Sequence, residues 1–205
     1  MNTARRALLK AGPALAAMAL AGCASPPTNY YRLAVTKGFV RPGIGLKIGV
    51  RSVSIPGYLS QNGIAKSGGE YQYNVYPNDL WAEALDDMLQ DVLVQDLAQR
   101  LPASTVLGTG GSIGVSSDLL IETNILRFDP DSDGQIVMNI QVAIRSGRDN
   151  SLWLTQTYNN IAMPAGPDVI SVVAAMSVLW GSAADQIANF VAESWSENGN
   201  DQDDG

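Results

Sequence analysis

Apolar and polar residues alternate along several short segments of this chain, which is the pattern of half-buried β-strands. The clearest case is 135–145, whose apolar face holds Ile136, Met138, Ile140, Val142 and Ile144. Further strands are predicted at 30–35, 47–55, 70–76, 105–107, 118–128 and 152–162. Residues 58–69 are polar and contain glycine, so they are predicted to form an exposed connection.

Two longer segments repeat apolar residues every three or four positions, which is typical of helices with one buried side. The first is expected to be capped by Asn78 or Asp79 and to end before Pro102. Its stripe is Leu80, Trp81, Ala84, Leu85, Met88, Leu89, Val92, Leu93 and Leu97. The second is expected to be capped by Asp168 and to run to about Trp195. Its uncharged stretch is shorter than the about 20 residues of a membrane span, so a buried core helix is predicted.

The order of these elements is β-β-β-α-β-β-β-β-α, which predicts an α+β domain. The last three strands are joined by short turns and should form an antiparallel meander. The fold class is therefore predicted as an antiparallel sheet with two long helices packed against it, in a single domain over 30–195. The tail 196–205 is polar and acidic and is expected to be disordered.

The first 22 residues have the pattern of an export signal. Arg5, Arg6 and Lys10 precede an apolar stretch that is too short to span a bilayer as a helix. The paired arginines fit a twin-arginine signal and a plain Sec signal equally well.

This signal peptide, 1–22, ends in a sequence that looks like a lipobox, Leu20-Ala21-Gly22-Cys23. Cys23 is the only cysteine, so no disulfide can form within the chain. We therefore predict that Cys23 carries acyl chains such as palmitate, because two or more chains anchor a protein stably to a membrane. Residues 23–29 would form a lipidated tether. Ala24 follows the cysteine where an aspartate usually marks inner-membrane retention, so the outer membrane is the expected location.

The charge and the residue types limit the chemistry. The 20 acidic residues exceed the 13 basic ones, and the signal peptide removes three of the basic ones. Such a surface repels phosphates, so nucleic acid is not an expected partner. The chain has no histidine, which removes the commonest general base and the commonest metal ligand. No metal site, no cofactor and no enzymatic activity are therefore expected.

Two motifs resemble functional sites but have a structural explanation. Gly110-Gly111-Ser112-Ile113-Gly114 matches a nucleophile elbow, yet a strand is predicted after it and no histidine exists to activate Ser112. The alternative function for this segment is a serine hydrolase that uses Lys47 or Lys66 as the base. The segment 129–134 begins like a calcium loop, but its twelfth position is Ile140, so a hairpin turn is predicted.

Charged and aromatic residues of the helices have similar structural explanations. Asp86, Asp87 and Asp91 lie off the apolar stripe and complement the dipole of the first helix. Trp81 and Trp180 are predicted to be core residues, and the positions of Trp153 and Trp195 stay open.

With the lipobox, several segments of the mature chain form a combined pattern. They are Tyr30-Tyr31-Arg32-Leu33, Ile48-Gly49-Val50, Val53-Ser54-Ile55-Pro56-Gly57-Tyr58-Leu59, the segment around Tyr73, and Leu80-Trp81-Ala82-Glu83. In order and spacing, this pattern resembles the PqiC-type ABC-transport auxiliary lipoproteins, the partners of MCE-domain lipid transporters.

The resemblance implies a role in lipid transport across the cell envelope and in membrane integrity. The implied partners are an MCE-domain protein and an inner-membrane transporter complex, and a homo-oligomer is left open. The domain would dock the transporter from the periplasmic face of the outer membrane. The alternative is a periplasmic carrier of lipid or another small molecule, with the helix Val169 to Val191 forming the wall of a cavity.

Overall fold

The computed structural model of this protein describes residues 26–198. The strands are β1 (Asn29–Tyr31), β2 (Lys47–Val50), β3 (Gly63–Gly69), β4 (Gln72–Trp81), β5 (Thr105–Gly108), β6 (Leu119–Pro130), β7 (Ile136–Ser146) and β8 (Leu152–Ala162). The helices are α2 (Leu85–Arg100) and α3 (Val169–Asn198). The predicted signal peptide, Cys23 and residues 199–205 lie outside the described residues.

Strands β5-β2-β6-β7-β8, in this order, form a five-stranded sheet. The predicted meander is confirmed, since β6, β7 and β8 pair antiparallel. The prediction of an antiparallel sheet is wrong for the other half, because β2 runs parallel to both β5 and β6. The chain reaches β5 through α2, and a helical crossover of this kind brings two strands into parallel register.

A second sheet has the order β1-β4-β3 and corrects two predictions. The segment predicted as a connection contains β3, which pairs antiparallel with β4 over its length. The predicted cap at Asn78 or Asp79 is wrong, because both residues belong to β4. Three residues of β1 pair in parallel with Asp79–Trp81 and the Trp81 N–H donates to the carbonyl oxygen of Asn62 at 2.7 Å, so this backbone is committed to a sheet. Helix α2 begins only at Leu85.

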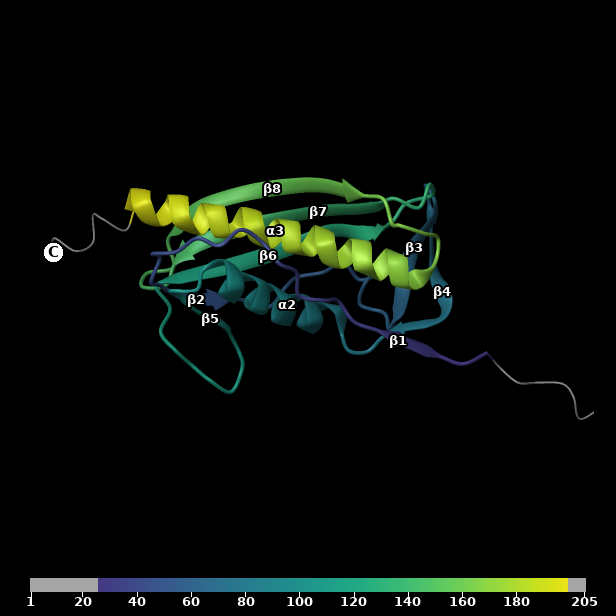
Figure 1. Cartoon of the computed structure of the whole chain (residues 1–205), viewed down its shortest axis with the longest axis horizontal. Helices are drawn as coiled ribbons and strands as arrows, with labels where there is room; N and C mark the ends of the chain where they lie inside the picture. Colours follow the sequence, from purple (N-terminus) through teal and green to yellow (C-terminus); the bar gives the residue numbers. More distant parts are fainter. Residues whose placement is uncertain (1–25, 199–205) are drawn as a thin grey trace, which may run out of the picture.

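Both helices cover the same face of the five-stranded sheet, as Figure 1 shows. Trp81 and Trp180 are buried, as predicted, and the Trp180 indole N–H donates to the Leu89 carbonyl oxygen at 3.0 Å, which fastens α3 to α2. Helix α3 is long and apolar enough to cross a bilayer, but 61% of its most apolar window is buried inside the domain. Packing on the sheet and on α2 therefore explains its composition.

The segment 32–41 lies along α2 and α3. The backbone N–H of Ala34 donates to the Ser177 hydroxyl at 3.0 Å, and the N–H of Thr36 donates to Asp96 at 2.9 Å. Further along, the Arg41 side chain donates to Asn189 at 2.7 Å. These bonds fix the beginning of the domain to both helices. The predicted strand 30–35 is therefore short, because its second half bonds to helix side chains instead of a neighbouring strand.

Arg100, the last residue of α2, lies fully buried at the junction of α2, α3 and this segment. Its guanidinium donates to Asp96 at 3.0 Å, to Asp185 at 2.9 Å and to the carbonyl oxygen of Gly181 at 2.9 Å. Burial raises the pKa of the Asp96 carboxyl, although Arg100 and the Thr36 N–H oppose the shift. The cluster ties three segments together and leaves water no access to Asp96.

Candidate functional site on the uncovered sheet face

The face of the five-stranded sheet opposite the helices has no covering layer over much of its area among residues 26–198. Alternation in β7 defines it, because Ile140 and Val142 are buried beneath the helices whereas Gln141 is exposed. A polar sheet face of this kind either contacts water or is covered by a partner.

Two arginines share one carboxylate on this face, near the turn between β7 and β8. Arg51 and Arg145 both pair with Glu122, and the Arg145 Nε lies 2.9 Å from the carboxylate. Arg51 also donates to the side chain of Asn150 at 3.0 Å, which connects the network to the turn between β7 and β8. In that turn, hydrogen bonds from Ser146 and Ser151 lower the pKa of Asp149 to about 2. The face therefore presents fixed charges of both signs.

A shallow groove of about 430 Å³ runs across the same face. It is lined by Arg51, Ser52, Ser54, Glu122, Thr123, Asn124, Gln141, Val142, Ala143 and Thr155. Most of these side chains are small, so a partner could approach the sheet backbone closely. Asn124 donates to Gln141 at 3.1 Å across neighbouring strands, which holds the floor of the groove in a single arrangement.

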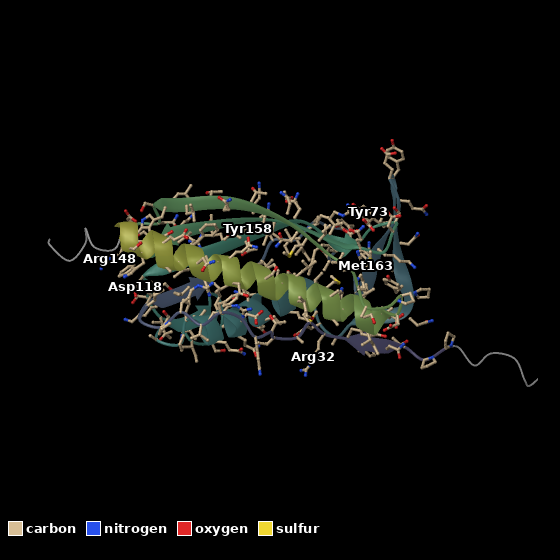
Figure 2. The ribbon with its side chains drawn as sticks, turned by 45° about the horizontal axis from the view of Figure 1, so that its top comes forward. Arg32, Tyr73, Asp118, Arg148, Tyr158 and Met163 are labelled. Carbon is tan, nitrogen blue, oxygen red and sulfur yellow. The ribbon has the colours of Figure 1, made fainter. Side chains whose placement is uncertain are left out.

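A second exposed feature is the hairpin of β3 and β4, which projects from one end of the domain (Figure 2). The predicted common face of Tyr71, Tyr73 and Val75 is exposed, and Tyr71 is 92% exposed. The ring of Tyr73 stacks on Tyr58 at 4.0 Å between ring centroids. Burial and the hydrogen bond to Asp129 raise the pKa of the Tyr58 hydroxyl, so this contact is unchanged through the neutral range.

The structure gives no support to the two catalytic or metal motifs. Ser112 lies exposed in the loop after β5, and the chain continues into β6 rather than into the helix that a nucleophile elbow needs. Asp129 is buried and bonded to Tyr58 and Arg127, while Asp131 accepts the backbone N–H groups of its own turn. The predicted hairpin turn is confirmed, and Gly134 supplies its positive φ of 82°.

The acidic residues of α2 behave as predicted. Asp87 and Asp91 are exposed and Asp86 is half-buried, and Asp86 and Asp87 lie in the first turn. No cluster of three candidate metal ligands occurs among the residues that the structure describes. Trp153 and Trp195, which were left open, are half-buried and pack against the edge of the core.

The fold defines a class of protein: an α+β domain whose two helices cover one face of a five-stranded mixed sheet and leave much of the other face uncovered among residues 26–198. Residues 31–188 match the family described as "ABC-type transport auxiliary lipoprotein component", and the chain belongs to this family. The predicted resemblance is thereby confirmed, and the family is a transport auxiliary family rather than a known enzyme family.

Individual relatives agree with this assignment. The chain is 33% identical over 131 residues to the intermembrane transport lipoprotein PqiC of Escherichia coli strain K12, which covers 61% of this chain and 68% of the relative. The fold is similar to a crystal structure of a protein from Xanthomonas campestris, with a TM-score of 0.71, 15% identity, and coverage of 84% and 99%. A crystal structure of an uncharacterized protein has a TM-score of 0.67 at 21% identity, covering 81% and 99%.

Sequence reasoning found the apolar inner positions of the sheet but missed the uncovered face as a site. Its residues come from β6, β7 and β8 and from the segment after β2. The signal available was the alternation in β7, which marks a polar face without showing what covers it. The lipidation of Cys23 stays a prediction, since this residue lies outside the described residues.

Proposed function

We propose that this protein is a lipid-anchored subunit at the periplasmic face of the outer membrane that docks the periplasmic part of an MCE-type lipid transporter. Acyl chains on Cys23 would hold it to the membrane, and the uncovered sheet face would bind the transporter. The family assignment supports a role as an auxiliary component of ABC-type transport. The similarity to an intermembrane transport lipoprotein supports an envelope location.

The observation that carries the docking proposal is the arrangement of the uncovered face. The Arg51–Glu122–Arg145 network holds its charged side chains in place. Charges in fixed positions can pair with complementary charges of a partner in one orientation. The groove beside this network has the small residues Ser52 and Ala143 in its lining, where a partner side chain can enter. Fixed charges beside a shallow groove suit a specific protein contact of moderate affinity.

The experiment uses a purified MCE-domain protein from the same organism. The lipidated protein is immobilised, and the dissociation constant for that partner is measured by surface plasmon resonance. Ala143→Glu places a charged side chain in the groove and is expected to abolish binding. Ala98→Glu introduces the same change at an exposed position of α2 and is expected to leave binding unchanged.

Two results would refute this proposal. Equal binding by the Ala143→Glu and Ala98→Glu variants would exclude the uncovered face as the docking surface. Normal resistance to envelope stress in a strain lacking the gene would contradict the role in envelope transport.

A carrier function is the second candidate, because a groove of about 600 Å³ lies between the hairpin and the loop before α3. Its apolar lining includes Met163, Pro164 and Val172, while the middle of α3, including Trp180 and Ala184, is packed tightly in the core. A bound lipid would therefore use the start of α3 rather than its centre. Native mass spectrometry of the purified protein tests this candidate, and only lipid-free protein in every preparation would exclude it.

A further inference from the structure

Exposed apolar side chains gather at one end of the domain. This end carries β1, the hairpin of β3 and β4, the end of β8 and the start of α3 (Figure 1), and Tyr73 and Met163 are labelled there in Figure 2. Among residues 26–198, it holds half of the large apolar side chains that are exposed, namely Tyr30, Tyr71, Tyr73, Val75, Ile161, Met163 and Ile170. Apolar side chains concentrated in this way mark an interaction surface.

The chain that leads to Cys23 leaves from the same end. Asn29 lies six positions after Cys23, so even a fully extended tether reaches only about 20 Å. Asn29 and Tyr31 are fixed, since β1 pairs with β4 and the Tyr31 hydroxyl donates to Asp79 at 3.0 Å. If Cys23 is acylated, this end of the domain is therefore held within that distance of the bilayer surface.

The side chains at this end suit the headgroup layer of a membrane. Tyrosine places an apolar ring and a polar hydroxyl at that level, and the exposed Ile170 and Met163 add apolar area. Tyr71 lies at the tip of the hairpin with 92% of its surface in water, so its own fold gives this ring almost no burial. A contact outside the domain would supply that burial.

The charges at this end select the kind of membrane. Glu70 is exposed at the hairpin tip, and Asp131 and Asp133 lie in the nearby turn before β7. The ammonium group of Lys66 lies 4.4 Å from the centre of the Tyr76 ring, so this cation is partly engaged within the protein. An acidic surface is repelled by anionic lipid and favours a zwitterionic leaflet.

We propose that this end of the domain, with Tyr71 at the hairpin tip, lies in the headgroup layer of the zwitterionic leaflet that holds the Cys23 anchor. The proposal rests on the lipid anchoring in the proposed function and adds the orientation of the domain. The long axis then points away from the membrane. The opposite end, with the loop 109–118, faces the periplasm. The uncovered sheet face is then oriented roughly perpendicular to the membrane plane.

The first experiment uses the fact that Cys23 is the only cysteine and is acylated in the lipidated protein. Tyr71→Cys and Met163→Cys each carry a fluorophore in lipidated protein reconstituted into phosphatidylethanolamine–phosphatidylcholine vesicles. Ile113→Cys, an exposed apolar position in the loop between β5 and β6, is the matched control, and this loop lies at the opposite end of the domain in Figure 1. Lipids with a nitroxide on the headgroup should quench the labels at positions 71 and 163 and leave the label at 113 bright. Equal quenching at all three positions, or quenching at 113 alone, would overturn the proposal.

The second experiment measures binding without the anchor, using the mature chain with Cys23→Ser and the same vesicles. Tyr71→Ser with Ile170→Ser is expected to lower the partition coefficient several-fold. The control pair, Phe39→Ser with Val178→Ser, removes exposed apolar side chains over the helices and is expected to leave it unchanged. Adding phosphatidylglycerol is expected to weaken binding. Equal partitioning of both pairs, or stronger binding to the anionic vesicles, would refute the proposal.

The transporter partner separates this inference from the proposed function. Lipidated Tyr71→Ser protein is expected to bind the MCE-domain protein normally, because the hairpin tip is not part of the sheet groove. Normal partner binding together with no quenching at position 71 would reject the membrane orientation alone. Recovery of the protein without acyl chains on Cys23 would reject the anchoring on which both depend.

Discussion

Replacing Arg100 with methionine tests how the two helices and the segment 32–41 are held together. The guanidinium is buried and donates to Asp96, to Asp185 and to backbone oxygens of Thr36 and Gly181. Methionine fills much of the same volume with apolar atoms but donates nothing. Asp96 then keeps the Thr36 N–H and loses its cation.

The magnitude follows from what each carboxylate can do without the arginine. The side chain of Asp185 is 24% exposed, so water can solvate it after the change. The side chain of Asp96 has no exposed surface, so without the guanidinium it either stays charged and uncompensated or binds a proton, and both outcomes cost free energy at neutral pH. Removing one partner of a buried ion pair costs about 3–5 kcal/mol. Since a domain is stable by only about 5–15 kcal/mol, Arg100→Met removes a large part of the free energy of unfolding.

The assay is equilibrium unfolding of the mature chain in urea, followed by tryptophan fluorescence. Arg100→Met is expected to lower the free energy of unfolding by about 3–5 kcal/mol. Asp96→Asn combined with Arg100→Met is expected to restore part of this loss, because the amide carries no charge and still accepts the Thr36 N–H. Arg145→Met is the control, and its half-exposed pair with Glu122 should contribute no more than about 1 kcal/mol.

Two outcomes would refute this reasoning. A loss from Arg100→Met no larger than that from Arg145→Met would show that the buried cluster contributes little. A double variant as unstable as the sum of its single changes would show that the unpaired charge of Asp96 is not the cause.

Three further predictions concern stability. Gly181→Ala should lower the thermal midpoint although alanine favours helices by about 1 kcal/mol, because the added Cβ would lie 1.7 Å from the Thr36 hydroxyl oxygen; a midpoint equal to or above that of the parent protein would contradict this. Asp168→Ala should cost about 1 kcal/mol in urea unfolding, since the Asp168 carboxylate accepts the Ser171 N–H at 2.9 Å at the start of α3; an unchanged midpoint would exclude a role for this cap. The pKa of Asp96 is raised above its ordinary value of 3.8, so the folded state binds more protons than the unfolded state. The contribution of Asp96 to stability therefore increases as the pH falls through the raised pKa. The destabilisation by Asp96→Asn should therefore shrink as the pH rises through the raised pKa, and a loss that grows over the same range would show the opposite shift.

The sequence determined the elements whose cause is local. Alternation over 135–145 placed Ile140 and Val142 on the buried face, because side chains of a strand point to opposite sides whatever the strand pairs with. The cap at Asp168 was found because its partner, Ser171, lies three residues further along the chain. The family pattern was also readable, since it is carried by short segments in a fixed order.

Only the tertiary structure decided the start of α2, the strand β3 and the parallel half of the large sheet. Leu80 and Trp81 fit the helical stripe as well as a strand, and pairing with β1 settled the choice. Arg100 lies in the last turn of α2, and α3 and the segment 32–41 bury it together with Asp96. Such contacts join residues many tens of positions apart, and no local pattern encodes them. The uncovered face and the apolar end arise in the same way, since both depend on where separate segments come to lie.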